Sequence, residues 1–246
     1  MFSTSRVRND FNDAAQRYDT HARLQQHVML QLIQRLPRLQ ADARVLDAGC
    51  GTGAFARSTQ HKNIVALDHA FQMCAEARNT NTLPVTADMT KLPFGNAAFD
   101  YVFSSLALQW APDWKKTLDE WKRVAKPKGM LAFSTFGAGT LRELAESFRV
   151  IDGFTHVSEF AEAQDIWQHI PAKVENETIT EYYPDVFTLS RHLKALGASN
   201  KHRNARRGLT TPAQLKKVEA HYAKQFGTAQ GLRVSWNVLY ATMQKP

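Results

Sequence analysis

The sequence predicts an α/β fold in which helices cover both faces of a parallel β-sheet. Short apolar segments of strand-like composition alternate with amphipathic segments, and a glycine-rich loop directly follows the first of them. The expected core strands cover residues 44–47, 63–68, 83–87, 99–104 and 129–136. Because ligands of such sheets bind at the carboxyl ends of the strands, we expect the functional site at that edge.

Amphipathic helices are expected before and between these strands. Apolar residues recur every four positions from Leu24 to Leu36, which predicts one helix over residues 10–36 that Pro37 ends. Further helices are expected from about residue 54, over residues 70–78 and over residues 113–125. The sheet is therefore expected to carry helices on each side.

The sequence changes in character after Gly137. The helical segments expected there cover residues 141–152, 160–169, 186–196 and 211–226, around a strand at 177–183, and a last strand covers 232–243. We interpret the chain as one domain with an N-terminal helical cap (1–40), a ligand-binding core (41–137), a helical substrate cover with the sixth strand (138–230) and a terminal strand (231–246).

Composition restricts the class of protein. Of the 246 residues 43% are hydrophobic and 22% are charged, which is typical of a globular chain. Two cysteines exclude a disulfide-stapled scaffold and a cysteine-rich zinc site, and we expect no metal. The chain has neither a signal peptide nor an apolar run of the ~20 residues that a membrane-spanning helix needs, so we expect a cytoplasmic protein. The net charge of +8 favours an acidic partner without choosing among nucleic acid, membrane and protein.

The glycine loop is the most informative segment. Gly49, Gly51 and Gly53 follow the first strand, and glycines allow a ligand to approach the backbone closely. The spacing up to Ala54 also satisfies the dinucleotide-binding pattern, so nicotinamide binding remains an alternative. However, Asp47 beside the loop would repel a pyrophosphate and would suit a cationic ligand. S-adenosylmethionine, which carries an ammonium and a sulfonium group, is such a ligand.

Two more carboxylates follow the next strands. Asp68 ends the second strand, where an acidic side chain can accept hydrogen bonds from both ribose hydroxyls. Asp88 follows the third strand, in position for the exocyclic amine of adenine, and we assign its neighbour Met89 and the fourth-strand Ser104 to the same site. A capping role explains either aspartate alone, but acidic residues after three successive strands favour S-adenosylmethionine.

These residues resemble a known family. The glycine loop, Asp68, Asp88 and the fourth-strand segment 99–104 are similar to the class I S-adenosylmethionine-dependent methyltransferases, over roughly residues 40–137. The resemblance implies a Rossmann-like sheet of seven strands with the last strand antiparallel. It also implies that the glycine loop and both aspartates contact the methyl donor.

The residues after the fourth strand indicate the acceptor. No Pro-Pro motif for adenine methylation follows this strand, and neither cysteine follows a proline as cytosine C5 methylation requires. Instead, Gln109 and Trp110 offer amide and indole N–H donors that suit a carboxylate. A carboxylate, with a pKa near 4, is ionised at neutral pH and needs no general base. Catalysis is then mainly alignment, which can supply roughly 7–11 kcal/mol, although Trp110 also fits a purely structural role.

Longer segments narrow the resemblance. Residues 108–110 are similar to carboxylate methyltransferases, including those acting on trans-aconitate, and the order of segments 11–25, 133–144 and 193–198 resembles the malonyl-acyl carrier protein O-methyltransferases. The resemblance implies methyl esterification of the free carboxyl of a malonyl thioester, an early step of biotin synthesis. It also implies that Tyr18 closes over the donor and the carboxylate. Lys128 departs from the family's Pro-Gly-Gly turn, away from the chemistry.

The same resemblance gives the excess of basic residues a purpose, because acyl carrier proteins are acidic. Our docking candidates are Lys201, Arg203, Arg206 and Arg207, and we expect His156 to reach the substrate. The carrier, acyl carrier protein or coenzyme A, stays open; we expect a monomer with no stable nucleic-acid or membrane partner. The alternatives are another acid, such as trans-aconitate or a carboxymethylated tRNA base, and a non-catalytic scaffold that binds a partner.

Overall fold

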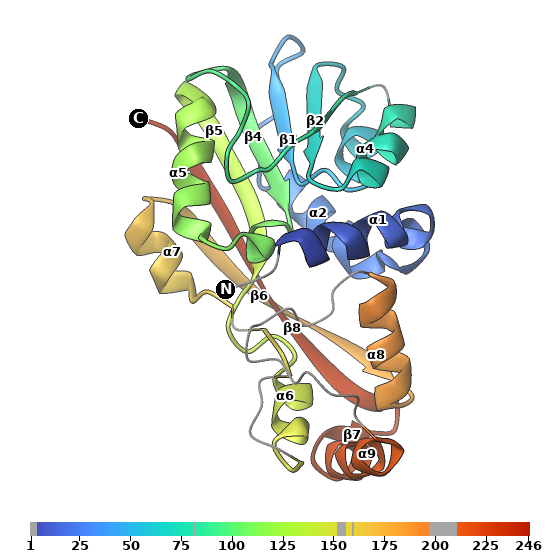
Figure 1. Cartoon of the computed structure of the whole chain (residues 1–246). Coiled ribbons are helices and arrows are strands. Elements are labelled where there is room, and N and C mark those ends of the chain that lie inside the picture. Colours follow the sequence, from blue (N-terminus) through green and yellow to red (C-terminus); the bar gives the residue numbers. More distant parts are fainter. Residues whose placement is uncertain (1–3, 81, 152–155, 159, 197–210) are drawn as a thin grey trace.

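One continuous sheet organises the molecule (Figure 1). The computed structural model describes residues 4–80, 82–151, 156–158, 160–196 and 211–246. Its strands are β1 (Val45–Ala48), β2 (Ile64–Asp68), β3 (Leu83–Thr86), β4 (Phe99–Ser105), β5 (Ala125–Phe136), β6 (Lys173–Tyr183), β7 (Gly227–Thr228) and β8 (Gly231–Gln244). Their order is β3-β2-β1-β4-β5-β8-β6, and the two-residue β7 pairs with β8.

Strand directions confirm the predicted fold class. The strands β1 to β5 pair in parallel, whereas β8 runs antiparallel to both of its neighbours, β5 and β6. Asp47 of β1 lies opposite Ala66 of β2 and Phe103 of β4, so these strands end at the same edge of the sheet. All four residues of β1 are buried, which explains why the segment is apolar except at Asp47.

Helices cover both faces of this sheet, as predicted. On one face α3 (Ala54–Thr59) places Phe55 against Phe103, with ring centroids 4.0 Å apart. On the other face α5 (Trp114–Val124) buries Leu118 and Trp121. Two hydrophobic clusters result, one on each face. The helix α4 (Phe71–Ala77) follows β2 and packs beside β2 and β3.

The N-terminal segment forms two helices, where the sequence predicts one. The first, α1 (Thr4–His21), lies across the carboxyl ends of the core strands (Figure 1), and α2 (Arg23–Gln34) packs against β4 and β5. The chain changes direction at Ala22, where φ is −87° and ψ is 32°. A single straight helix cannot both fill the apolar groove beneath α2 and cover the strand ends.

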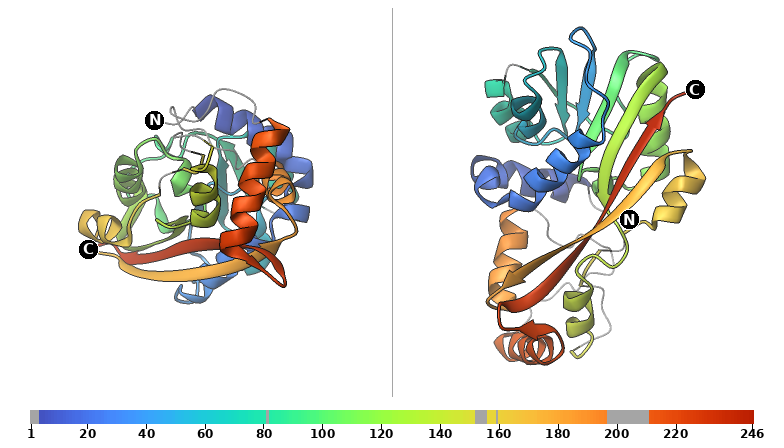
Figure 2. Two further views of the ribbon diagram at one scale, coloured as in Figure 1. Left: turned by 90° about the horizontal axis from the view of Figure 1, so that it is seen from below. Right: turned by 180° about the vertical axis from the view of Figure 1, so that it is seen from behind.

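The long strands β6 and β8 extend beyond the core and carry the remaining helices, as Figure 2 shows from behind. The cover contains α6 (Arg142–Phe148), α8 (Val186–Ala195) and α9 (Pro212–Phe226), while α7 (Ala163–His169) lies near α5. Glu143 of α6 is fully buried and accepts hydrogen bonds from the backbone N–H and the hydroxyl of Ser235 in β8. The cover is thus fastened directly to the strand that crosses the core.

None of the helices within the described residues is long and apolar enough to span a membrane.

Candidate functional site

The glycine loop forms the end of the sheet at which the ligand is expected. Gly49 has a φ of +82°, and a Cβ atom there would overlap the Cβ of Ala107. Gly51 has a φ of +53°, lines the cleft described below, and donates its N–H to Asp68 Oδ2 at 3.0 Å. Gly53 serves packing instead, because a Cβ there would lie 2.9 Å from Thr80 Oγ1. Gly53 does not line this cleft.

A cofactor cleft with about 800 Å³ of open space lies at the carboxyl ends of β1, β2, β3 and β4, beneath α1. It brings together most of the residues predicted to hold the cofactor. Its lining includes Phe11, Tyr18, Gly49, Gly51, Asp68, Asp88, Met89, Ser105 and Trp110.

Backbone N–H groups hold both oxygens of the Asp68 carboxylate at the edge of the cleft. Its Oδ1 accepts from the N–H of Ala70 at 2.8 Å and its Oδ2 accepts from the N–H of Gly51. These backbone contacts fix both oxygens and leave lone pairs on each for further hydrogen bonds. Burial raises the pKa of Asp68, and the hydrogen bonds to its charged form partly offset that rise.

Asp47 lies in a neighbouring side hollow, which is lined also by Tyr18, Gly49 and Gln25. The residue is 3% exposed, and no hydrogen bond reaches its carboxylate from the described residues. Burial, with the charge of Asp68 as a second cause, raises its pKa to about 8. The amide oxygen of Gln25 is likewise buried without a partner among the described residues.

This pair of orphaned acceptors tests whether the site fits S-adenosylmethionine. A buried carboxylate and a buried amide oxygen, both without a donor, are costly unless a ligand supplies one. The ammonium group of S-adenosylmethionine carries a positive charge and three N–H donors, and it meets both needs. A pyrophosphate would meet neither, so the side hollow fits the methyl donor and argues against a nicotinamide dinucleotide.

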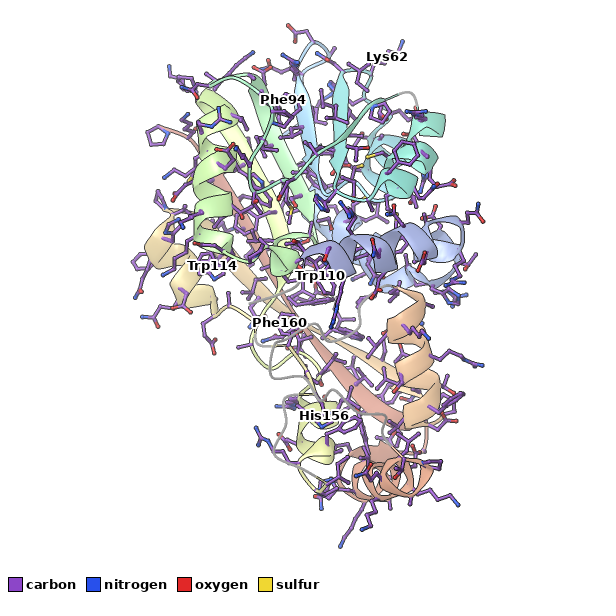
Figure 3. The ribbon with its side chains drawn as sticks, in the orientation of Figure 1. Lys62, Phe94, Trp110, Trp114, His156 and Phe160 are labelled. Atoms are coloured by element: carbon purple, nitrogen blue, oxygen red, sulfur yellow. The ribbon has the colours of Figure 1, made fainter. Side chains whose placement is uncertain are left out.

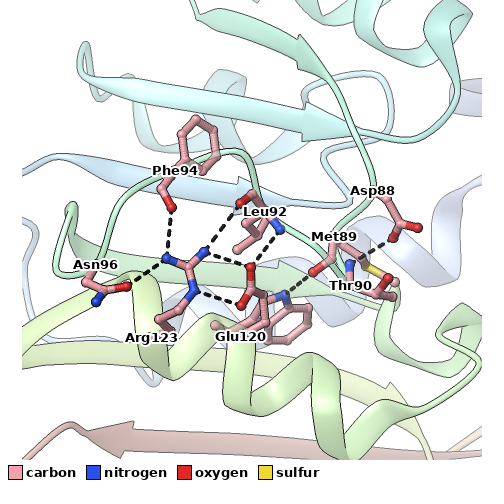
Figure 4. A network of polar contacts seen from close by, with 9 residues as sticks. Asp88, Met89, Thr90, Leu92, Phe94, Asn96, Glu120 and Arg123 are labelled. Atoms are coloured by element: carbon pink, nitrogen blue, oxygen red, sulfur yellow. Dashed lines mark hydrogen bonds and ion pairs between the residues drawn. The ribbon is translucent and has the colours of Figure 1, made fainter.

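The loop that carries Asp88 and Met89 is held rigidly from α5 (Figure 4). Glu120 accepts from the N–H of Leu92 at 2.8 Å, and Trp121 Nε1 donates to the carbonyl of Met89 at 3.3 Å. Arg123 donates to Glu120 and to the loop oxygens of Leu92, Phe94 and Asn96. These contacts fix the loop that lines the adenine side expected for the cleft.

Asp88 caps a turn and also lines the cofactor cleft. Its Oδ1 accepts from the N–H of Thr90 at 2.8 Å, which caps the turn, and the residue also lines the cleft. Ser104, in contrast, is fully buried, and its hydroxyl donates to the carbonyl of Ala48 at 2.6 Å. The structure does not bring Ser104 into the cleft; its neighbour Ser105 lies there instead, because successive strand residues point to opposite faces.

Below the cofactor cleft, a lower cavity with about 1500 Å³ of open space separates the core from the cover. Trp110 lines both the cleft and the cavity, and Figure 3 shows it between the core and the labelled cover residues Phe160 and His156. The Trp110 ring packs edge-on against Phe11, with centroids 5.6 Å apart. Its indole N–H has no hydrogen-bond partner among the described residues. Trp110 therefore lies at the boundary where a ligand in the cofactor cleft would contact a ligand in the lower cavity.

Gln109 lies in the lower cavity with one amide N–H committed. Its Nε2 donates to the carbonyl of Leu106 at 2.6 Å, and its Oε1 accepts from the hydroxyl of Thr135 at 3.2 Å. An amide nitrogen has two N–H groups, so one remains for a ligand. The short turn η2 (Leu108–Trp110) sets both side chains at the end of β4.

Tyr18 of α1 lines both the cofactor cleft and the side hollow. Burial raises the pKa of its hydroxyl, and the charges of Asp68 and Asp19 raise it further, so the group stays protonated at neutral pH. His156 stacks on Phe148 with centroids 4.1 Å apart and lines the lower cavity. The predicted docking residues Lys201, Arg203, Arg206 and Arg207 lie outside the described residues.

Sequence reasoning assigned no role to several residues of these spaces. Phe11 lies on the same face of α1 as Tyr18, and Gln25 follows the helix break that the sequence did not reveal. Arg17 of α1 and Lys194 of α8 line the lower cavity. The spacing of Phe11, Ala15 and Tyr18 is the one signal that could have placed α1 over a site.

A glycine loop, carboxylates after successive parallel strands and a covering helix are together the features of a class I methyltransferase, which uses S-adenosylmethionine as its methyl donor. Residues 46–133 match a family model described as a methyltransferase domain. A solved putative methyltransferase from Bacillus halodurans superposes with a TM-score of 0.61 at 16% identity, covering 89% of this chain and 98% of that one. A Haemonchus contortus phosphoethanolamine N-methyltransferase solved with S-adenosylhomocysteine gives 0.54 at 21% identity, covering 89% and 52%.

The sequence comparison is more specific. The malonyl-acyl carrier protein O-methyltransferase of Erwinia billingiae is 33% identical over 242 residues, which cover 96% of this chain and 95% of that protein. This chain belongs to the malonyl-acyl carrier protein O-methyltransferase family. The resemblance read from the sequence, the enzyme class and the cofactor are thereby confirmed.

Proposed function

We propose that the protein transfers a methyl group from S-adenosylmethionine to the free carboxyl of a malonyl thioester carried on acyl carrier protein, an early step of biotin synthesis. The observation that carries the proposal is the position of Trp110, which lines both the cofactor cleft and the lower cavity in which Gln109 also lies. The name of the relatives supplies the acceptor.

In our proposal each of the three carboxylates binds a different part of the cofactor. Asp47 and Gln25 hold the ammonium group, Asp68 accepts from the ribose hydroxyls, and Asp88 with Met89 contacts adenine. When bound, S-adenosylmethionine supplies an electrophilic methyl group on a cationic sulfur. Residues 41–137, with Gln25 of the N-terminal cap, accordingly bind the donor, and residues 138–230 cover the acceptor.

The chain's own groups orient the acceptor rather than activate it. A malonyl carboxylate is ionised at neutral pH, so no side chain has to remove a proton from it. The indole N–H of Trp110 and the remaining N–H of Gln109 would hold one carboxylate oxygen and leave the other free to attack in line. Fixing this geometry can contribute roughly 7–11 kcal/mol, and Tyr18 with Phe11 excludes water from above.

The decisive experiment measures the intact mass of malonyl-acyl carrier protein after incubation with the protein and S-adenosylmethionine. We expect one added methyl group, formed faster than on malonyl-coenzyme A or trans-aconitate. Methylation of trans-aconitate or of a nuclease-sensitive tRNA acceptor instead would discard the malonyl assignment and keep the donor site. Cofactor binding without transfer to any acid would support the scaffold alternative.

The setting of the reaction is part of the proposal. We propose that the enzyme works as a monomer in the cytoplasm, without a stable nucleic-acid or membrane partner. Cys50 and Cys74 are both unpaired, which is the state that a reducing compartment maintains. Light scattering of the purified protein, alone and with acyl carrier protein, measures its oligomeric state and tests the first part.

A further inference from the structure

The lower cavity is larger than the proposed acceptor group requires. Its roughly 1500 Å³ of space is partly open to solvent, but its lining reaches from Gln109 and Trp110 to His156 and Lys194, so it extends past a three-carbon malonyl group bound at Trp110. The reacting carboxylate needs only the end near Trp110 and Gln109. The rest of the cavity is therefore free for whatever is attached to the malonyl group.

The cavity has a buried apolar side and an exposed polar side. The buried residues that line it are Phe136, Leu141, Leu144, Phe148 and Trp236. The exposed residues that line it come from α1 and α8, and they are Asp13, Arg17, Ser190 and Lys194. We take the exposed side as the mouth, because only there can a long substituent leave the cavity for solvent.

Two cations at this mouth have no ion-pair or hydrogen-bond partner in the part of the chain that the structure describes. Neither the guanidinium of Arg17 nor the ammonium of Lys194 forms an ion pair or hydrogen bond with the described residues. Asp13 lies one turn before Arg17 and is paired with neither. The helices that carry the cations are adjacent, since the rings of His21 in α1 and His192 in α8 lie 6.0 Å apart.

We propose that Arg17 and Lys194 form a phosphate subsite for the phosphorylated pantetheine arm that carries the malonyl thioester. The inference rests on the proposed function and deepens it. The apolar side of the cavity would contact the pantetheine chain, and the phosphate at its far end would lie between the two cations at the mouth. Arginine suits this role because its planar fork can bind two phosphate oxygens at once.

The subsite would let the enzyme recognise the carrier arm of its substrate at a point remote from the reacting carboxylate. Contacts to the carrier arm fix how deeply the thioester enters, and thereby bring the carboxylate to Trp110. Since both cations are exposed, we expect a moderate effect that falls as salt screens the charges. We therefore expect the phosphate to strengthen binding about tenfold.

The test uses two small probes that lack the carrier protein. Calorimetry measures the affinity of 4′-phosphopantetheine and of pantetheine for the enzyme saturated with S-adenosylhomocysteine. We expect the wild type to bind the phosphorylated probe about tenfold more tightly, and the Arg17→Ala, Lys194→Ala double variant to bind both alike. Its affinity for unphosphorylated pantetheine should be unchanged. Asp13→Asn should raise the preference for phosphate.

The matched control is Lys62→Ala, an exposed cation at the opposite end of the molecule (Figure 3), which should keep the tenfold preference. Equal affinities in the wild type, a preference that survives the double variant, or no binding of either probe would overturn the subsite. The proposed function has its own arm, in which wild-type enzyme methylates malonyl-acyl carrier protein. If that arm succeeds and the probes show no preference, only the subsite fails; if malonyl-acyl carrier protein is not methylated, the function itself fails.

Discussion

The cofactor cleft and the lower cavity are built by the chain in different ways. The cleft and its side hollow take their carboxylates from the ends of three consecutive parallel strands, so neighbours in the sheet are also neighbours in the sequence. The cavity collects α1, η2, α6, α8 and β8, which lie up to 226 positions apart between Asp10 and Trp236. A site on strand ends can be inferred from a short motif, whereas a site between a core and its cover depends on the folded arrangement.

Removing the Asp47 carboxylate should have the largest effect of these changes, and the effect should fall on donor binding in the side hollow of the cleft. Asp47→Ala leaves the ammonium of the donor without its counter-charge in a buried hollow, so we expect the affinity for S-adenosylhomocysteine to fall at least about 100-fold. Calorimetry measures it. The exposed Asp119→Ala, at a similar charge change, should keep wild-type affinity. An unchanged affinity of the Asp47 variant would refute the assignment of the hollow.

A change at Trp110 should lower turnover without weakening donor binding, and thereby distinguish the role of the lower cavity from that of the cofactor cleft. Trp110→Phe keeps an aromatic ring against Phe11 and removes the indole N–H together with the five-membered ring that carries it, so we expect turnover to fall about 10- to 100-fold. Donor affinity should stay within about twofold. Steady-state kinetics with calorimetry gives both values. A large loss of donor affinity with normal turnover would reverse the roles given to the cleft and the cavity.

Donor binding should depend on pH through Asp47. Its pKa is raised to about 8 in the cofactor-free protein, and a cationic ligand requires the ionised form. Binding at pH 6 to 8 should therefore release a proton, and affinity should rise by up to about tenfold per pH unit before levelling above pH 8.

The stability of the cofactor-free protein should change with the opposite sign. An unfolded aspartate titrates near pH 4, so the raised pKa favours the folded state at low pH, and that contribution is lost as pH rises toward 8. For the donor-binding prediction, calorimetry in buffers of different ionisation enthalpy counts the protons released when the donor binds. Binding without proton release at pH 6 to 7 would contradict the raised pKa.

The change with the smallest expected effect tests whether α5 positions the loop that carries Asp88 and Met89. Arg123→Ala removes the contacts to Leu92, Phe94 and Asn96, so Asp88 and Met89 should lose their fixed position. We expect the KM for the donor to rise about fivefold, with kcat at saturating donor nearly unchanged. The neighbouring Lys122→Ala serves as the control. A fall in kcat with an unchanged KM would show that the loop does not position the donor.

The sequence predicts the order of the core elements and most cleft residues, because strand ends and glycine positions are local features. It does not distinguish Ser104 from Ser105, since only the register of the folded sheet decides which of two adjacent side chains faces the ligand. Gly53 belongs to the loop motif, yet its neighbour Thr80 gives it a packing role. The helix break at Ala22 has no local signal, because alanine favours helix and only tertiary packing overrides it.

The position of β8 in the sheet has a consequence for how the protein is made. This strand lies between β5 and β6, pairing with β6 over residues 232–242 and with β5 over residues 238–244, although it follows both of them in the sequence (Figure 1). While the ribosome is still translating residues 1–230, β5 has an unpaired edge and the cover has no strand to join it to the core. The nascent chain therefore exposes open sheet edges until β8 has emerged, and during that interval chaperone protection matters most.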